Sequence, residues 1–228
     1  MNKLLFMLLT IASVLTTACS DQCSIAGNST VGSLDGRMLY LRVSCNGQEV
    51  MSLDSCEVTH GRFTFSSTLD STRVAQVCIG NESLMPVVLE TGELVVQVDH
   101  SGQRVSGGPL NDRLYEFLQR KERIENEQWE LDRKCMEMLH SGKSPEEINR
   151  EIAPKAKKLA KKLEDLETKF IKDNYDNALG PGCFMWLFRQ YPFPVMTNQI
   201  ERIVKDAPPQ FLCDPYVSHY LRVARQGR

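Results

Sequence analysis

Eight cysteines and four histidines are the residues of this chain that could carry redox, nucleophilic or metal chemistry. Thiol-disulfide exchange needs an activated thiolate beside a second cysteine, and zinc sites need closely spaced Cys and His. The chain has no Cys-x-x-Cys, and no histidine lies at zinc-ligand spacing from a cysteine pair. The sequence therefore predicts no redox motif, no metal site and no cofactor.

The histidines are scattered along the chain, as His60, His100, His140 and His219. The first three stand beside turn residues, which predicts solvent exposure. Gly-x-Ser-x-Gly, His-Glu-x-x-His and Gly-rich phosphate loops are all absent from the sequence. A catalytic triad assembled from distant positions stays open as a minor alternative. We expect no catalytic residues and a protein that is not an enzyme.

The N-terminus has the pattern of a secretory signal peptide. Lys3 gives a short positive region, an apolar run extends from Leu4 to Leu15, and small residues lead to Cys19. About a dozen apolar residues are too few to span the ~30 Å hydrocarbon layer as a helix, and no later stretch reaches the ~20 that are needed. We therefore expect residues 1–18 to be a signal peptide.

Cys19 follows small residues in a way that resembles a bacterial lipobox. The resemblance implies cleavage before Cys19 and lipid attachment to it, which would make the membrane a partner through the anchor. Thr16 stands where the usual pattern has leucine, so a secreted protein with a free Cys19 is the alternative. Ser20 rather than aspartate follows the cysteine, which by the same resemblance implies the outer membrane. Periplasmic and surface exposure both stay open.

Seven cysteines remain after Cys19, and an odd number cannot all pair. The sequence suggests one candidate disulfide, between Cys45 and Cys56 around an Asn46-Gly47 turn. The alternative is that these cysteines are buried thiols that act as small apolar residues. Both interpretations stay open at this point.

Residues 23–105 read as a β-rich half. Short runs of alternating apolar and polar residues are separated by turn dipeptides every 8 to 12 residues, a spacing typical of an antiparallel β-sandwich or partly open barrel. In the second run, Leu39, Leu41 and Val43 would share the buried face. The expected strands are 24–27, 38–45, 49–53, 62–66, 74–79, 84–89, 94–98 and 103–105.

The turn and strand residues of this half carry a family resemblance, through their order and spacing over most of residues 24–118. They are Gly27, Leu34-Asp35-Gly36, Leu39-Tyr40-Leu41, Leu53-Asp54-Ser55, Gly61-Arg62-Phe63-Thr64-Phe65, Leu89-Glu90-Thr91-Gly92, Val105-Ser106-Gly107 and Leu110-Asn111-Asp112. The pattern resembles domain of unknown function 4369. That resemblance implies a β-rich module of exported lipoproteins of Gram-negative bacteria, commonly placed before a thioredoxin-like domain. We expect structural roles for these residues, with Asn111-Asp112 as a helix N-cap.

A helical half follows from residue 109. A seam of mostly apolar residues at alternating spacings of three and four predicts one long helix. Its members, with two polar interruptions, are Leu114, Phe117, Lys121, Ile124, Gln128, Leu131, Cys135 and Met138. Ser144-Pro145-Glu146-Glu147 predicts the start of a second, where Pro154 should kink or restart the helix. Its apolar stripe is Ile148, Ile152, Ala156, Leu159, Leu163, Leu166 and Phe170. The two helices should form an antiparallel hairpin, with Trp129 packed on the β half or on a partner.

The C-terminal residues should form short helices. A turn at Gly180-Pro181-Gly182 should lead into the dense apolar run from Cys183 to Gln190, which must be buried. Thr197 and Asp214 are expected to cap two further helices. The basic run Lys155, Lys157, Lys158, Lys161 and Lys162 could bind phosphate, but acidic neighbours favour a solvated mixed-charge face.

These patterns predict an α+β protein with a signal peptide at 1–18, a β-rich domain at 19–108 and a helical domain at 109–228. The net charge of −2 argues against nucleic acid as a partner. We expect a lipid-anchored cell-envelope protein that acts as a non-catalytic binding module for an unidentified protein or glycan. The alternative is an accessory of periplasmic thiol-disulfide exchange that lacks its own thioredoxin domain.

Overall fold

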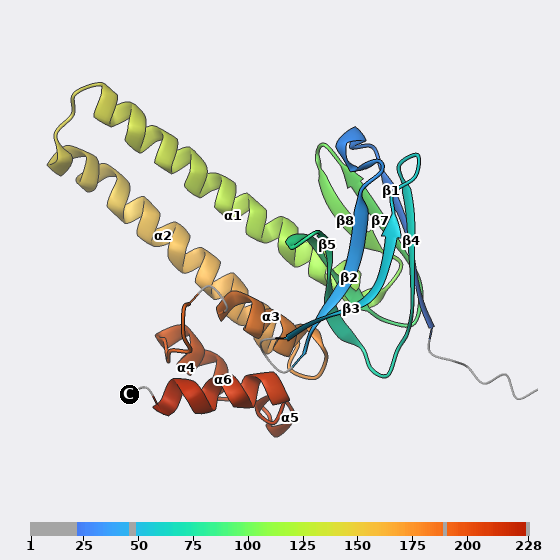
Figure 1. Ribbon diagram of the computed structural model, residues 1–228. Coiled ribbons are helices and arrows are strands. Elements are labelled where there is room, and N and C mark those ends of the chain that lie inside the picture. Colours follow the sequence, from blue (N-terminus) through green and yellow to red (C-terminus); the bar gives the residue numbers. More distant parts are fainter. Residues whose placement is uncertain (1–21, 46–48, 189–190, 227–228) are drawn as a thin grey trace, which may run out of the picture.

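The computed structural model describes residues 22–45, 49–188 and 191–226. A β-sandwich forms the N-terminal part, a long helical hairpin projects from it, and short C-terminal helices pack beside the base of the hairpin (Figure 1). The predicted fold class, a β-sandwich followed by long and then short helices, is confirmed.

The sandwich contains the eight expected strands in two sheets. One sheet has the order β4-β1-β7-β8 and the other β3-β2-β5-β6. Their bounds are β1 Gln22–Ser29, β2 Met38–Cys45, β3 Glu49–Glu57, β4 Arg62–Thr68, β5 Arg73–Ile79, β6 Glu82–Leu89, β7 Gly92–Asp99 and β8 Gly102–Ser106, with a short 3-10 helix at Gly32–Leu34. As predicted, Leu39, Leu41 and Val43 are buried, whereas the alternate residues of β2 are not.

One pair of strands departs from the expected antiparallel pattern. β1 lies parallel to β7, with Ile25 opposite Leu94, and antiparallel to β4 on its other side. Sequence periodicity identifies strands and their buried faces but not which distant strand is the partner. β1 therefore enters between two strands that follow it by more than 30 residues.

Two long helices form the arm, which we define as α1 (Pro109–His140) and α2 (Pro145–Lys172). Their 32 and 28 residues correspond to lengths of about 48 and 42 Å at ~1.5 Å per residue. The predicted α1 seam faces α2: its apolar members are buried and Lys121, Gln128 and Cys135 are half-buried. Within the seam, Lys121 Nζ lies 2.9 Å from Glu167 Oε1.

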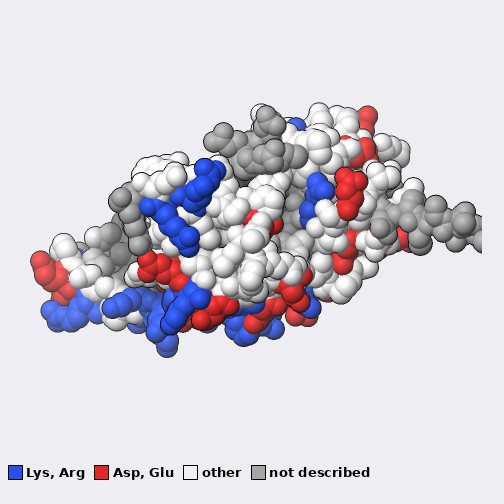
Figure 2. All heavy atoms as spheres, turned by 90° about the horizontal axis from the view of Figure 1, so that it is seen from below, with Lys and Arg blue, Asp and Glu red and all other residues white. Residues whose placement is uncertain are grey.

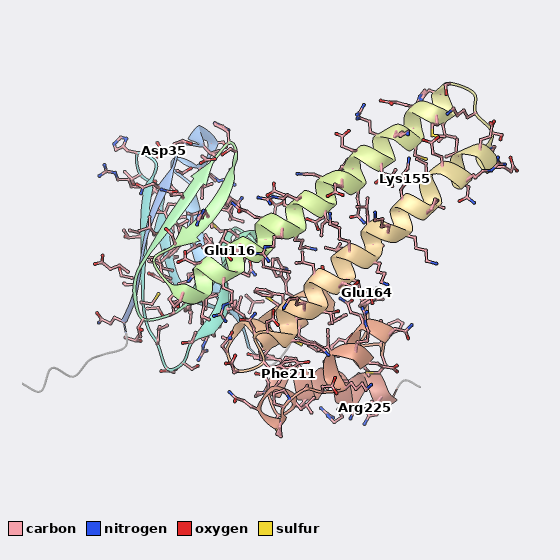
Figure 3. The ribbon with its side chains drawn as sticks, turned by 180° about the vertical axis from the view of Figure 1, so that it is seen from behind. Asp35, Glu116, Lys155, Glu164, Phe211 and Arg225 are labelled. Carbon is pink, nitrogen blue, oxygen red and sulfur yellow. The ribbon has the colours of Figure 1, made fainter. Side chains whose placement is uncertain are left out.

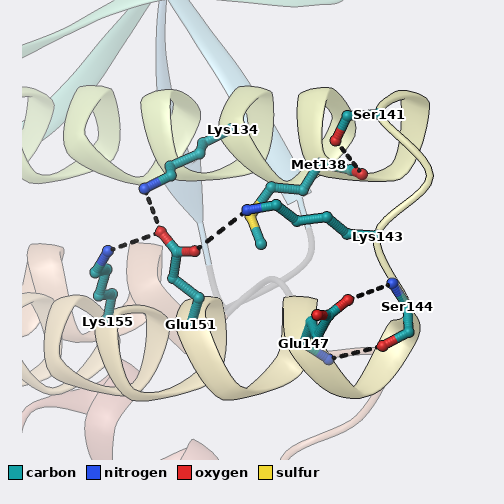
Figure 4. A network of polar contacts seen from close by, with 8 residues as sticks. All are labelled: Lys134, Met138, Ser141, Lys143, Ser144, Glu147, Glu151 and Lys155. Carbon is teal, nitrogen blue, oxygen red and sulfur yellow. Dashed lines mark hydrogen bonds and ion pairs between the residues drawn. The ribbon is translucent and has the colours of Figure 1, made fainter.

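The turn between the helices shows the predicted capping box. Ser144 Oγ accepts a hydrogen bond from the Glu147 backbone amide at 3.3 Å, and Glu147 Oε2 accepts one from the Ser144 amide at 3.0 Å (Figure 4). Beside it, Glu151 bridges Lys134 of α1 and Lys155 of α2. Helix α2 continues through Pro154 without the predicted restart. Proline has no N–H to donate to the carbonyl of the preceding turn, but Pro154 is exposed, so water can hydrogen-bond that carbonyl instead.

Four short helices complete the chain: α3 (Leu179–Phe188), α4 (Asn198–Val204), α5 (Pro209–Leu212) and α6 (Pro215–Gln226). The predicted turn at Gly180-Pro181-Gly182 is instead the first turn of α3, where proline removes no helical hydrogen bond. A Cβ at position 182 would lie 2.5 Å from Val74, so this glycine lets α3 approach β5. Thr197 and Asp214 cap α4 and α6 as predicted.

One continuous hydrophobic core joins the sandwich to the base of the arm and to the C-terminal helices. It includes Leu94 and Val105 of the sandwich, Leu114 and Phe117 of α1, and Phe184 of α3. Phe117 stacks on Phe170 of α2, with ring centroids 4.1 Å apart. The base of the arm is therefore fixed to the sandwich by shared packing, whereas the distal part of the arm extends away from it (Figure 3).

Candidate functional site

The joint between sandwich and arm is held by a buried polar pair, Glu90 and Asn111. Glu90 Oε1 accepts hydrogen bonds from the Asn111 backbone amide at 3.0 Å and from Asn111 Nδ2 at 2.8 Å. Asn111 also bonds both backbone groups of Val88, donating to its carbonyl and accepting from its amide. Asn111 is fully buried, and Glu90 nearly so.

The prediction that Asn111-Asp112 caps the helix is wrong. The N-cap of α1 is Gly108, which has no side chain, and Glu90 of the sandwich supplies the missing acceptor to the Leu110 and Asn111 amides. A carboxylate beside a helix N-terminus is also favoured by the helix dipole. These residues therefore position the arm, and every polar group of the pair is used inside the fold.

The cysteine thiols are not arranged as a redox pair. In the β2–β3 hairpin, Cys45 pairs with Glu49 and Cys56 with Leu39, six positions along the strand. That separation is about 20 Å at ~3.3 Å per residue, far beyond the ~7 Å limit of a disulfide. The prediction of a Cys45–Cys56 disulfide is therefore wrong, and Cys56 is a free thiol.

Burial raises the pKa of every cysteine for which a shift is resolved. Desolvation raises the pKa of Cys23, Cys56 and Cys78, and raises that of the fully buried Cys183 to about 12. Such thiols carry little thiolate at neutral pH. Cys213, between α5 and α6, is exposed, whereas Cys23, Cys78 and Cys183 are buried.

The remaining candidates for chemistry lie apart. His60, His100, His140 and His219 are all exposed, which confirms the prediction made for the first three. Within the described residues, no group of three or more His, Cys, Asp or Glu could hold a metal ion. Cys19, the predicted site of lipid attachment, lies outside the described residues. No helix in residues 22–45, 49–188 and 191–226 is long and apolar enough to cross a membrane.

The five lysines of the basic run in α2 are exposed, as the mixed-charge interpretation predicted. Lys162 lies 2.8 Å from Glu127 of α1, and Lys155 lies 3.5 Å from Glu151. Nearer the base, Arg202 of α4 bonds Glu164 and Asp165. On the face seen from below, basic and acidic atoms are interspersed along the arm (Figure 2). These charges stabilise contacts between helices and leave no purely basic patch there.

Trp129 does not pack on the sandwich as expected. Its side chain is 75% exposed on the distal part of α1. Trp129 follows the seam residues Ile124 and Gln128 by five positions and one position, about 140° and 100° around the helix, and so lies on the flank of α1 outside the seam. It borders a groove whose lining includes Glu122, Glu125, Asp132 and Ala156. The most exposed aromatic side chain of the described residues therefore stands beside carboxylates on a projecting arm.

Two more large apolar residues of α1 are exposed beyond Trp129. Met136 is 54% and Leu139 50% exposed. Met136 follows Trp129 by seven positions and therefore lies on the same face. We define the outer strip as Trp129, Met136 and Leu139 together with the charged residues between them. Trp129 was predicted to lie outside the seam, whereas the exposure of Met136 and Leu139 was not predicted. The seven-residue spacing of Trp129 and Met136 was the available signal, because it places the two side chains on one helix face.

A search of curated proteins found no match to the chain. One family model matches residues 23–114, which include all strands from β2 to β8, most of β1 and the first residues of α1. The match contains Glu90 and Asn111, so the joint belongs to the matched region, whereas the outer strip lies beyond it. That model is the one described as Domain of unknown function (DUF4369), to which residues 23–114 are similar.

Proposed function

We propose that this protein is a non-catalytic interaction module of the cell envelope, anchored by a lipid on Cys19 and presenting its helical arm to a partner. The observation that carries the proposal is Trp129, which is 75% exposed at a distance from the core that joins arm and sandwich. Large exposed aromatic side chains are over-represented at protein interfaces and dominate their energetics. A protein or a glycan of the envelope could use such a surface, since both stack on indole rings.

The charges near Trp129 support a partner with basic groups. Glu122 and Asp132 have no hydrogen bond or ion pair to another described residue, and both line the groove beside the indole. Unpaired carboxylates beside an aromatic face attract cations through charge and through the ring quadrupole. The same carboxylates repel phosphate groups, so nucleic acid is not part of the proposal.

The test is affinity capture from detergent-solubilised membranes with the full chain and its Trp129→Ala variant. Trp186→Ala, in α3, is the matched control because that indole is 39% exposed and belongs to a different helix from Trp129. The proposal expects a specific partner whose recovery falls at least about tenfold with Trp129→Ala and is unchanged with Trp186→Ala. Equal recovery with all three chains would contradict a role for the arm.

Lipid attachment has its own test. Metabolic labelling with a fatty-acid analogue should mark the full chain and should not mark a Cys19→Ser variant. The variant should also be lost from the membrane fraction, because without Cys19 the protein carries no acyl chains to insert into the bilayer. Labelling that survives Cys19→Ser would place the modification elsewhere and contradict this part of the proposal.

The alternative proposal, an accessory of thiol-disulfide exchange, depends on Cys213. This thiol is exposed at the turn that precedes α6, unlike the buried Cys23, Cys78 and Cys183. Thiol trapping from membranes should then yield a mixed disulfide that is lost in Cys213→Ser and kept in Cys135→Ser. A partner recovered equally after reduction would favour the non-catalytic module instead.

A further inference from the structure

The lipid anchor proposed at Cys19 lies very close in sequence to the sandwich. Strand β1 begins at Gln22, three residues after Cys19. Even a fully extended chain of three residues reaches no farther than about 11 Å. Acyl chains on Cys19 would insert into the bilayer and place that residue at the membrane surface. They would therefore also hold the start of β1 close to the lipid headgroups.

Strand pairing identifies the part of the sandwich that is held in this way. Gln22 lies opposite Thr68, the last residue of β4, and Cys23 lies opposite Gly92, the first residue of β7. We define the anchor end as the end of the sandwich marked by Gln22, Thr68 and Gly92, together with the β4–β5 and β6–β7 turns. It is the lower end of the sandwich in Figure 1.

The arm leads away from the anchor end. Strand β6 runs toward that end, because the β6–β7 turn lies there. Asn111, in the first turn of α1, bonds Val88, whereas Tyr115, one turn later, donates to the Pro86 carbonyl at 2.8 Å. Successive turns of α1 therefore move back along β6, and the helix rises away from the anchor end in Figure 1. An anchored chain would thus direct Trp129 away from the bilayer.

The last helix of the chain lies at the anchor end. Tyr216 of α6 donates a hydrogen bond to the Ser44 carbonyl at 2.6 Å, near the end of β2. That end of β2 lies beside the start of β5, because the two strands are antiparallel, and β5 starts at the β4–β5 turn. On its buried side α6 packs on α3, where the Tyr220 and Phe184 rings are 5.5 Å apart. Helix α3 in turn contacts α2, so α6 is the layer farthest from the arm (Figure 1).

The free face of α6 is basic. The buried residues of this helix are Val217, Tyr220, Leu221 and Ala224, and its exposed residues include Ser218, His219, Arg222 and Arg225. Residues 215–228 contain no aspartate or glutamate. Arg222 bonds the His219 ring at 2.9 Å, and Arg225 has no hydrogen bond or ion pair to another described residue. Guanidinium groups bind phosphate well, and basic residues near a membrane are attracted to anionic lipids.

We infer that the anchored protein lies on the bilayer with its anchor end and the free face of α6, and that Arg222 and Arg225 contact the headgroups of anionic phospholipids. The rim of the sandwich adds no attraction of its own, since the exposed Asp70 and Glu93 outnumber Arg73 there. The short tether fixes which end faces the membrane, and α6 supplies the charge. The inference rests on the lipid anchor proposed above and adds the orientation in which the arm is presented.

The first test measures which parts of the chain lie at the headgroups. The lipidated full chain is reconstituted in vesicles of phosphatidylcholine and phosphatidylglycerol in which some headgroups carry a spin label that quenches tryptophan. One chain keeps Trp129 and has Trp186→Phe, and another has both tryptophans changed to phenylalanine and carries Ser218→Trp on α6. The Ser218→Trp probe should lose at least about half of its emission, whereas Trp129, about 30 Å along α1 from the start of the arm, should lose none.

The second test reverses the charge of α6. Arg222→Glu with Arg225→Glu, in the chain with the Ser218→Trp probe, should lower the quenching at least about twofold, because anionic headgroups then repel the helix. Arg120→Glu with Arg123→Glu is the matched control, since both residues are exposed on α1 and the charge change is the same. The control should leave the quenching unchanged. Circular dichroism of each variant checks the fold.

The outcomes separate this orientation from the anchor itself. A chain that is labelled with fatty acid on Cys19 and bound to vesicles, but whose Trp129 is quenched as strongly as the α6 probe, overturns the orientation and leaves the anchor standing. So does an α6 probe that is not quenched. Quenching that is insensitive to the reversal of Arg222 and Arg225 contradicts headgroup binding by α6. A chain without lipid on Cys19 overturns anchor and orientation together, and fatty-acid labelling detects that case separately.

Discussion

Glu90 Oε1 accepts two hydrogen bonds from Asn111, one from its backbone amide at 3.0 Å and one from its side-chain amide at 2.8 Å. The carboxylate follows β6 and the asparagine lies in the first turn of α1, 21 residues later. Because Asn111 also holds both backbone groups of Val88, the end of β6 and the start of α1 form one polar unit. This unit fixes the direction in which the arm leaves the sandwich.

Asn111→Ala should therefore be strongly destabilising. It leaves the Val88 amide and carbonyl without their partners and removes a donor from the buried Glu90. With each buried unsatisfied group costing ~1–3 kcal/mol, we expect a loss of at least about 3 kcal/mol in the free energy of unfolding. Urea denaturation measures it.

Asp112→Ala is the matched control for this change, because Asp112 is the next residue of the helix and is exposed. Its interaction with the helix dipole is worth ~0.3–1 kcal/mol. Equal losses for the two variants would mean that the Asn111 hydrogen bonds contribute little, and that the joint is held by the apolar core alone.

Gly108→Ala tests the close approach between α1 and Glu90. A Cβ at this position would lie 2.1 Å from Glu90 Oε1, so the carboxylate would have to move and release the Leu110 and Asn111 amides. We expect a loss of at least about 2 kcal/mol, from the unsatisfied amides. Gly32→Ala is the control, because nothing lies within 4 Å of its added Cβ and its backbone is not left-handed. A Gly108→Ala protein as stable as the wild type would contradict the proposed crowding.

The joint also shows which features the sequence predicts and which it does not. The strand runs, the helix seam and the capping box at Ser144 depend on local periodicity and local side-chain bonds, and all three were predicted. The Glu90–Asn111 pair and the parallel pairing of β1 with β7 depend on contacts between distant segments, about which the local pattern carries no information. Local sequence likewise does not show that Gly108 is needed because Glu90 occupies the space of its side chain.

The outer strip shows a similar division. The sequence placed Trp129 outside the seam, but an indole off the seam can equally cover a neighbouring domain. The choice depended on where the sandwich lies relative to the arm, and the structure places the distal half of α1 clear of it (Figure 1). Candidate surface residues were therefore predictable by helix face, and their exposure was not.

Thiol labelling should separate the cysteines by burial. In the folded chain at neutral pH, Cys213 should react with a maleimide first because it is exposed. Cys183 should react only on unfolding, because it is fully buried and desolvation raises the pKa of its thiol to about 12. Mass spectrometry of peptides after timed labelling measures both rates. Fast labelling of Cys183 in the native protein would contradict its position in the core beside Phe184.

The tip of the arm should loosen in acid. The hydrogen bond and charge of Lys134 lower the pKa of Glu151 below its ordinary value of 4.5, and the Ser144 backbone amide similarly lowers the pKa of Glu147 (Figure 4). A carboxyl whose pKa is lower in the folded state stabilises that state above its unfolded pKa. The contribution is lost as the pH falls through the folded value. The tip should therefore be insensitive to pH above about 5.5 and weaken progressively below the ordinary glutamate range.

Amide exchange measures this locally, as the ratio of the rate in Glu151→Gln to the rate in wild type at the same pH, over peptides that cover residues 134–151. The ratio should exceed one at pH 7, where only the wild type has the ionised Glu151 between Lys134 and Lys155. It should approach one near pH 3, where protonation of Glu151 removes the same interaction from the wild type. Glu146→Gln, at an exposed position of the same helix, is the control. An ion pair that depends on the carboxylate charge must weaken when that charge is neutralised. A ratio for Glu151→Gln that stays constant from pH 7 to pH 3 would therefore show that the bridge does not hold the two helices together at the tip.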